Sequence, residues 1–308
     1  MLPLPDANSN QANPFLSVGV RHVKVWRIPE VRPVSPTKSR LNADATASSP
    51  KMAPKALSGR NCLLGNLGDN TFTCVASISG HEAVVGTDSG ALCLLDDSEG
   101  CQKLSFIKYV DYGITSLAAD FDHSLLWVAG RGRKIEKISF KSLRPLLASP
   151  SSPELIEKKP GNETCKGPSI ICIGSLSSHL VTTDATRATN IYPMETFNAG
   201  DEPRQPQIST SAHRDPVLGI ASLKMPNNLS AEFFTWSCKG HVHFWDTHGR
   251  CLDSRKVGLE QFPGCNDDMS NELRKLRATE GMELFVSGDR FGVLRYNAPP
   301  RAKLLHMY

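Results

Sequence analysis

The residues that come nearest to a metal-binding pattern are three histidines in the segment HVHFWDTH. His241 and His243 are two positions apart, and His248 follows them. Side chains two positions apart on a β-strand lie on the same face, so His241 and His243 could together bind zinc. The same spacing is typical of outward positions that alternate with buried ones, here Val242 and Phe244. We favour this second interpretation, and the sequence predicts no metal site.

Two segments match phosphate-binding motifs only in part. GNETCKG at 161–167 lacks the Gly-Lys-Ser/Thr ending of a phosphate-binding loop, and GRGRKI at 130–135 has Ile135 where a dinucleotide-binding motif has its third glycine. The basic run at 131–134 could contact phosphates, but a solvated turn is the favoured interpretation. No G-x-S-x-G nucleophile motif occurs. We therefore predict no catalytic residue and no cofactor.

Composition narrows the classes of function further. The chain has 308 residues and a formal net charge of +4, too small to indicate nucleic-acid binding unless basic residues gather on one face. It has no apolar run of the roughly 18 residues that indicate a membrane-spanning helix, and its start lacks the pattern of a secretory signal. Nine cysteines without a C-x-x-C pair favour free thiols in a reducing compartment. We expect a cytoplasmic protein without membrane contacts, with the cytoskeleton, spindle pole or nucleus as alternative locations.

A repeated hairpin is the strongest signal in the sequence. Each copy has an apolar strand, a turn with glycine or polar residues, and a second strand with alternating apolar positions. Glycine supplies the positive φ that a tight turn needs, and alternation predicts one buried and one solvated face. The copies are FLSVGVRHVKVW at 15–26, AVVGTDSGALCLLD at 83–96, LLWVAGRGRKIEKISF at 125–140, LVTTDATRATNIYP at 180–193, FFTWSCKGHVHFWD at 233–246 and LFVSGDRFGVLRYN at 284–297.

Further strands flank these hairpins, so the repeating unit is a four-stranded sheet. Equivalent core positions recur every 43–69 residues, which fits propeller blades with loop insertions. Because one such sheet cannot bury both of its faces, the sheets must stack around an axis. We predict an all-β protein with a β-propeller fold. The flanking strands are expected at 72–77, 101–107, 114–119, 169–175, 217–222, 250–257 and 273–278.

Two segments, HVKVW and HVHFWD, resemble the final strand of a WD40 repeat. His213 in SAHRDPV lies 32 residues before Trp245, where that family has a Gly-His pair, with alanine here in place of the glycine. In that family the histidine bonds a Ser or Thr of the second strand, which bonds the Trp. The resemblance thus implies that Thr235 or Ser237 fills the middle role. The implied structural network comprises His213, Thr235, Ser237, Trp245 and Asp246, with Trp26 in the first repeat.

The repeats predict a WD40 β-propeller with about five full four-stranded blades and a partial first blade. The hairpin at 15–26 has too few residues before it for an innermost strand, so an incomplete or truncated ring is expected. A closed ring of five or six blades is the alternative. The expected units are 1–28 (C-terminal part of a truncated blade), 29–56 (a disordered, basic, Pro/Ser-rich linker) and 57–308 (blades at approximately 57–110, 111–147, 168–197, 213–257 and 272–308).

Exposed connections carry the candidate regulatory and contact sites. Ser35, within S-P-T-K of the linker, fits a proline-directed kinase site, and a phosphate there would add roughly −1.5 to −2 units of charge. Serine-proline pairs are also common in disordered linkers, so Ser35 is a candidate phosphosite only. The segments 148–167 and 198–215 are predicted to be exposed loops between blades and possible partner contacts.

Three segments, in the same order, are similar to a narrower family of WD-repeat proteins. The first hairpin, LSGRNCLLG at 57–65 and SGDRFGVLR at 287–295 resemble segments of the mitogen-activated protein kinase-binding proteins, which include the microcephaly-associated spindle-pole protein. The resemblance implies a scaffold that binds proteins, with kinases and cytoskeletal or spindle-pole components among them. The family's long C-terminal region, which carries kinase docking, has no counterpart among these 308 residues. No kinase-binding residue is therefore assigned.

Two other classes of function remain as alternatives. A nucleic-acid-associated propeller needs a basic patch on one face, and Lys and Arg are scattered along this sequence. A propeller hydrolase would show S-x-D-x-G-x-T-W turns, but the nearest match, SGDRFGVL, has Phe291 in place of glycine. We therefore predict a non-catalytic protein-interaction scaffold whose partners are other proteins. No pattern predicts an oligomeric state.

Overall fold

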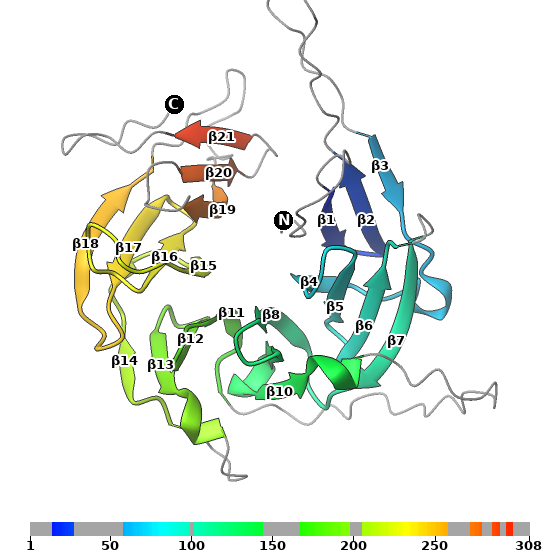
Figure 1. The fold of residues 1–308 in the computed structure, drawn as a ribbon, viewed down its shortest axis with the longest axis horizontal. Coiled ribbons are helices and arrows are strands. Elements are labelled where there is room, and N and C mark those ends of the chain that lie inside the picture. Colours follow the sequence, from blue (N-terminus) through cyan, green and yellow to red (C-terminus); the bar gives the residue numbers. More distant parts are fainter. Residues whose placement is uncertain are drawn as a thin grey trace, which may run out of the picture.

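The described residues form six antiparallel β-sheets, arranged in an arc around a central axis (Figure 1). We call the sheets blades 1 to 6 in chain order. This arrangement confirms the prediction of an all-β propeller. The computed structural model describes residues 14–27, 58–98, 102–143, 167–197, 205–257, 272–278, 285–289 and 294–297.

The strands of each blade follow one another in the sequence. Blade 1 contains β1 (Pro14–Gly19), β2 (His22–Arg27) and β3 (Ser58–Asn61). Blade 2 contains β4 (Phe72–Ser77), β5 (Glu82–Thr87), β6 (Ala91–Asp96) and β7 (Lys103–Tyr109). Blade 3 contains β8 (Ile114–Asp120), β9 (Leu125–Gly130) and β10 (Ile135–Ser139).

The other three blades repeat this order. Blade 4 contains β11 (Ile170–Ser175), β12 (His179–Asp184), β13 (Thr189–Pro193) and β14 (Ile208–Thr210). Blade 5 contains β15 (Val217–Ser222), β16 (Phe233–Ser237), β17 (His241–Trp245) and β18 (Cys251–Lys256). Blade 6 contains β19 (Leu273–Ala278), β20 (Phe285–Asp289) and β21 (Leu294–Asn297).

The helices of the described ranges are single turns, and none is long and apolar enough to cross a membrane. They follow strands or lie in the connections between them. They are η1 (Gly65–Leu67), η2 (Arg131–Arg133), η3 (Phe140–Leu143) and η4 (Met194–Phe197).

The inner strands β4, β8, β11, β15 and β19 share a feature that no single hairpin reveals. Each has a shift of register after its first residue, so that its second residue bulges out of the ladder. In β4 and β8 the bulged residue is threonine. The Thr73 hydroxyl donates to the Ile114 carbonyl at 2.6 Å, and the Thr115 hydroxyl donates to the Ile170 carbonyl. Neighbouring blades are thus joined next to the axis.

Blade 1 is partial, as predicted: β1 takes the place of a second strand, and no described strand lies on its inner side. Its outer strand differs from the prediction. Residues 58–61, which we assigned to the next unit, pair with β2 instead. A Cβ on Gly59 would lie 2.6 Å from the Trp26 ring, so glycine allows this strand to lie against the tryptophan. Blade 2 itself begins at Phe72.

A second difference lies within the predicted loop 198–215. Ile208–Thr210 forms β14 and pairs with β13, with Ile208 opposite Ile191. A strand of three residues is too short to show an alternating pattern, so the sequence gives no signal for it. Blades 2, 4 and 5 have four strands, and blades 1, 3 and 6 have three within the described residues. The linker 29–56 with Ser35 and residues 148–166 lie outside the described residues. So does AKLLHMY at 302–308, for which the sequence predicts the fourth strand of the last blade.

Apolar side chains form five clusters, and each cluster lies between two neighbouring blades. In β16, Phe233 packs with Ile191 of blade 4, whereas the adjacent Phe234 packs with Leu273 and Leu276 of blade 6. The second strands of blades 2 to 5 are therefore buried on both faces. The prediction of one solvated face applies to the alternating strand that follows each turn. In β17 the buried Val242 and Phe244 alternate with half-buried histidines, as predicted. In β6 and β13 neighbouring blades cover both sides, and there the prediction is wrong.

Candidate interaction face

One end of the propeller is formed by the turns between the second and third strands of each blade. These turns are hydrogen-bonded to the connections that lead into inner strands: the Arg131 amide donates to Gly113 at 3.1 Å, and the Cys238 amide donates to Pro216 at 3.0 Å. Turns and connections therefore make one surface, which we call the turn face. Its turns span residues 20–21, 88–90, 131–134, 185–188 and 238–240.

Three of the residues predicted for the WD network, His213, Thr235 and Trp245, meet in blade 5. His213 Nε2 lies at hydrogen-bond distance, 2.7 Å, from the Thr235 hydroxyl, and the Trp245 indole donates to the same hydroxyl at 2.9 Å. All three side chains are buried. Thr235 thus occupies the middle role that the sequence left open between Thr235 and Ser237.

Burial holds His213 in its neutral form. It lowers the pKa of His213 to about 3, and the neighbouring His243 and His241 act in the same direction. The His243 ring lies 4.2 Å from the His213 ring, centroid to centroid. A neutral imidazole has one nitrogen that can accept a hydrogen bond from the Thr235 hydroxyl, whereas both nitrogens of a charged imidazole donate. The network is therefore an uncharged set of hydrogen bonds that connects His213, Thr235 and Trp245.

The other residues predicted for the network have separate roles. The Ser237 hydroxyl accepts a hydrogen bond from the His241 amide at 3.2 Å, which closes the following turn. Asp246 accepts a hydrogen bond from Arg250 Nε at 2.6 Å after the third strand. In blade 1 the Trp26 indole donates to Ser17 at 2.8 Å. Blade 1 thus has the Trp–hydroxyl bond of blade 5.

The proposed histidine pair has partners other than a metal. His241 Nδ1 lies 3.0 Å from an Asp215 carboxylate oxygen, whereas His243 faces the His213 ring. His248 is exposed in a turn. Within the described residues, no three His, Cys, Asp or Glu side chains are placed to hold a metal ion.

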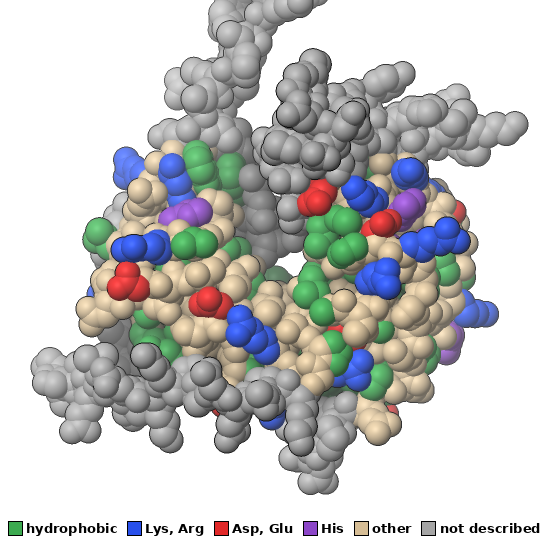
Figure 2. Space-filling model, turned by 180° about the vertical axis from the view of Figure 1, so that it is seen from behind, with side chains coloured by type: hydrophobic (Ala, Val, Ile, Leu, Met, Phe, Trp, Pro, Cys, Tyr) green, Lys and Arg blue, Asp and Glu red, His purple; other side chains and the backbone are tan. Residues whose placement is uncertain are grey.

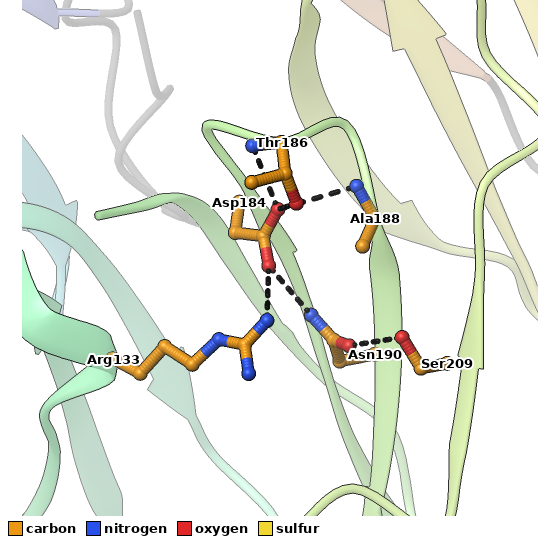
Figure 3. A network of polar contacts seen from close by, with 6 residues as sticks. All are labelled: Arg133, Asp184, Thr186, Ala188, Asn190 and Ser209. Carbon is orange, nitrogen blue, oxygen red and sulfur yellow. Dashed lines mark hydrogen bonds and ion pairs between the residues drawn. The ribbon is translucent and has the colours of Figure 1, made fainter. Parts of the chain in front are cut away.

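A second polar network lies at the turn face between blades 3 and 4, and we did not predict it from the sequence (Figure 3). Its centre is Asp184, which is 1% exposed. The carboxylate accepts hydrogen bonds from Arg133 Nη2 at 3.1 Å and from Asn190 Nδ2 at 3.3 Å. Its other oxygen accepts bonds from Thr186 and from the Ala188 amide. An ion pair thus ties blade 3 to blade 4.

The ionised form of Asp184 is favoured despite its burial. Burial by itself raises the pKa of Asp184, but the hydrogen bonds from Thr186, Arg133 and Asn190 outweigh it, so the pKa lies below the ordinary value. A sequence signal for this site exists in hindsight. Asp184 ends a second strand and accepts the amide four residues later, as Thr87 and Ser237 do in their blades.

Arginine occupies an unusual backbone position in three of the turns. Arg21, Arg133 and Arg187 have φ angles of 57°, 59° and 72°. The equivalent turns of blades 2 and 5 have glycine there, Gly90 and Gly240, with φ of 86° and 83°. A left-handed conformation costs an L-residue roughly 1 kcal/mol or more, which glycine avoids. Strained backbone of this kind is concentrated at functional sites.

Basic side chains extend from the turn face of blades 3 to 5. Arg131, Arg187, Arg214 and Lys239 are all exposed. Figure 2 shows the space-filling surface, with an opening at the centre and with Lys and Arg (blue) more widespread than Asp and Glu (red) on the side in view.

Comparison with known proteins identifies the fold. No family model matches the sequence, and no curated protein matches it. The chain is similar to the WD40 β-propeller domain of Doa1 (TM-score 0.50, 14% identity, 78% of this chain and 69% of that chain). It is also similar to a chain of the mitotic checkpoint complex (TM-score 0.55, 13% identity, covering 94% of this chain and 71% of that chain). A third similar chain comes from the structure of BBS1N in complex with ARL6DN (TM-score 0.54, 13% identity, covering 99% of this chain and 80% of that chain). The fold is a WD40 β-propeller, as predicted.

Proposed function

We propose that this WD40 propeller is a non-catalytic protein-interaction scaffold and that its turn face docks a partner. The observation that carries the proposal is the placement of exposed arginines at left-handed turn positions of one face. Glycine would satisfy the backbone there, as it does in blades 2 and 5. Arg187 forms no ion pair within the described residues, so an external role for its side chain explains the strained position.

Buried aspartates give the scaffold a fixed shape. Asp97 accepts a hydrogen bond from Arg27 at 2.6 Å and joins blades 1 and 2. Asp120 accepts one from Ser175 at 2.7 Å and joins blades 3 and 4, as Asp184 does with Arg133. The first two ties lie at the strand ends opposite the turn face and the third at the turn face, and together they fix neighbouring blades relative to each other. A surface that is already ordered loses little entropy when a partner binds.

A finer proposal rests on the sequence resemblance. The segments similar to the kinase-binding and spindle-pole family favour a role in kinase signalling or mitotic spindle organisation, with kinases or spindle-pole components as partners. Two of the similar structures are assemblies of several proteins, the mitotic checkpoint complex and BBS1N with ARL6DN. These assemblies agree with protein partners in general and favour no particular one.

The proposal is tested by comparing the partners of two matched variants in dividing cells. Arg131→Gln/Arg187→Gln/Arg214→Gln removes three charges from the turn face. The control, K103Q/K141Q/K224Q, removes three exposed charges near the opposite ends of the strands. Quantitative affinity purification should show proteins that bind the wild type and the control but not the turn-face variant.

Cross-linking locates the contact. A docked partner should cross-link to Lys239 on the turn face in preference to Lys141. Equal recovery of every protein by both variants would contradict the scaffold proposal. If the wild type and the turn-face variant recover the same proteins once the samples are treated with nuclease, the nucleic-acid-associated alternative would be favoured. Enrichment of the chain at spindle poles, abolished in the turn-face variant alone, would support the finer proposal.

A further inference from the structure

We propose that the turn face of blades 3 to 5 binds an extended, Asp/Glu-rich segment of a partner protein. The inference rests on the proposed scaffold function and names the chemistry of its partner. The binding residues are Arg131, Arg187, Arg214 and Lys239, which we call the basic track. Guanidinium groups bind carboxylates through paired hydrogen bonds, so this set matches a series of carboxylates along a peptide.

The arginines of the basic track differ from other arginines of the protein in their partners. Arg27, Arg133, Arg250 and Arg255 each form an ion pair with an aspartate, at 2.6 to 3.1 Å. Arg131 and Arg214 form no side-chain hydrogen bond or ion pair with any described residue. Arg187 donates only to the backbone carbonyl of Arg214. Their positive charge is therefore available to an incoming group.

The backbone of Arg187 carries the inference further. Its φ of 72° is the conformation that Gly90 and Gly240 adopt in the corresponding turns. Arg133 is the other arginine of this kind in blades 3 to 5, and its side chain bonds Asp184 within the protein. Arg187 has no such internal use, although it occupies a position at which glycine is less strained. Recognition of an external acidic group accounts for arginine there.

Contacts between blades link the turns and the connection that carry the basic track. The Arg133 amide donates to Pro168 at 3.1 Å, in the connection to blade 4. Arg187 of blade 4 reaches Arg214 in the connection to blade 5, and the next residue, Asp215, is bonded to His241. Two acidic residues on this surface, Asp184 and Asp215, are thus already engaged. Asp88 and Asp111 lie in the turn of blade 2 and the connection after it, at one end of the track, and Glu272 lies near Cys238, next to Lys239, at the other end.

The distribution of the charges favours carboxylates over a phosphate group or a nucleic acid. A phosphate is usually held by several basic groups gathered at one point. Here the basic residues come from separate turns and one connection of neighbouring blades, which suits single charges spaced along a chain. Nucleic-acid binding depends on many phosphate contacts, and the net charge of +4 is small for such a ligand.

Fluorescence anisotropy tests the proposal on the full chain. The probe is a labelled peptide of about ten residues that alternates Glu and Gly, with the Gln/Gly peptide as its uncharged match. A single-phosphoserine Gly/Ser peptide and a single-stranded oligonucleotide of the same length are the competing probes. The proteins are the wild type, Arg187→Gly, the turn-face variant Arg131→Gln/Arg187→Gln/Arg214→Gln and the opposite-face control K103Q/K141Q/K224Q.

We expect the Glu/Gly peptide to bind the wild type and the control at least about tenfold more tightly than it binds the turn-face variant, because each charge-assisted contact contributes strongly to affinity. Arg187→Gly should weaken binding while the unfolding midpoint stays the same or rises. The Gln/Gly peptide should not bind. Equal binding of the Glu and Gln peptides, or tighter binding of the phosphopeptide or the oligonucleotide, would overturn the inference.

The two proposals fail separately. If the Glu/Gly peptide does not bind, but the turn-face variant still loses its partners in cells, the scaffold function stands and the acidic segment is wrong. If the variant also keeps every partner, both proposals are wrong. An intact fold in each variant is checked by circular dichroism and by its unfolding midpoint.

Discussion

Blades 4 and 5 place a buried titratable side chain at the same end of the molecule, but they use it differently. In blade 5, His213 is neutral and bonds Thr235 and, through it, Trp245 of the same blade. In blade 4, Asp184 is charged and bonds Arg133 of the neighbouring blade. The first network fixes one blade, and the second fixes the position of two blades relative to each other.

The neutral network of blade 5 and the ion pair between blades 3 and 4 stabilise the fold in different ways. A neutral network survives in an apolar environment because no ionic charge has to be desolvated. An ion pair reaches across a blade boundary, but it requires both charges, since removing one leaves the other buried and uncompensated. Arginines at the turn face therefore fall into two kinds, those with an internal partner such as Arg133 and those without one such as Arg187.

The largest effect is expected from breaking the blade 5 network at its apolar end. Trp245→Ala removes the indole that bonds Thr235 and packs against Phe233 at 6.3 Å between ring centroids. We expect the free energy of unfolding to fall by about 4 kcal/mol. Urea unfolding followed by circular dichroism measures it. In the half-buried blade 1 counterpart, Trp26→Ala should cost clearly less, and equal losses would contradict the ranking.

Next in size is the ion pair between blades 3 and 4. Arg133→Gly keeps the left-handed turn free of strain but removes the partner of Asp184, and we expect a loss of about 2 to 3 kcal/mol in unfolding free energy. The loss should shrink on acidification, because Asp184 without its guanidinium partner becomes protonated in the folded variant at a higher pH than in the folded wild type. If Arg133→Gly lowers the unfolding free energy no more than Arg187→Gly does, the ion pair between Arg133 and Asp184 does not stabilise the fold.

Stability should also depend on pH through His213. Its pKa of about 3 in the folded chain is below the ordinary value of about 6.5 expected in the unfolded chain. The unfolded chain therefore gains a proton first as pH falls, so stability that is fully present above pH 6.5 is lost progressively on acidification. From pH 7 to pH 5 this group should remove about 2 kcal/mol.

Urea titrations at several pH values check this dependence in the wild type and in His213→Gln. The variant should show a shallower slope between pH 7 and pH 5. Some dependence of the unfolding free energy on pH should remain in His213→Gln, because burial and the neighbouring His241 also lower the pKa of His243. Asp120 and Asp184 have lowered pKa values, so their contributions are lost at more acidic pH. Identical slopes for the two proteins would contradict a neutral His213.

The smallest effect is expected at Arg187. Arg187→Gly relieves the left-handed strain and increases the entropy of the unfolded chain, so the two changes largely cancel. We expect unfolding free energy to change by less than about 0.5 kcal/mol. A differential scanning measurement of the midpoint is sufficient. Marked destabilisation would mean that the Arg187 side chain has a structural role, which would remove the reason for assigning it an external one.

The sequence predicts those features that depend on local pattern. The hairpins, their apolar faces and the approach of His213 to Trp245 through a second-strand hydroxyl follow from alternation and from the WD40 resemblance. It does not predict features that depend on distant pairing. Arg133 and Asp184 are 51 positions apart, and the partner strand of β2 at Ser58–Asn61 follows a long linker. The φ angles of the arginines depend on turn geometry, which residue types alone do not determine.

Partner recovery by the single variant Arg187→Gly tests the central claim most directly. Wild type and variant are expressed in the same cells at equal levels, and proteins that copurify with each are quantified alongside the unfolding midpoint of each chain. The account predicts that the midpoint is unchanged or slightly higher while recovery of turn-face partners falls severalfold. Full recovery of every partner at an unchanged midpoint would contradict the claim that Arg187 serves docking on the turn face.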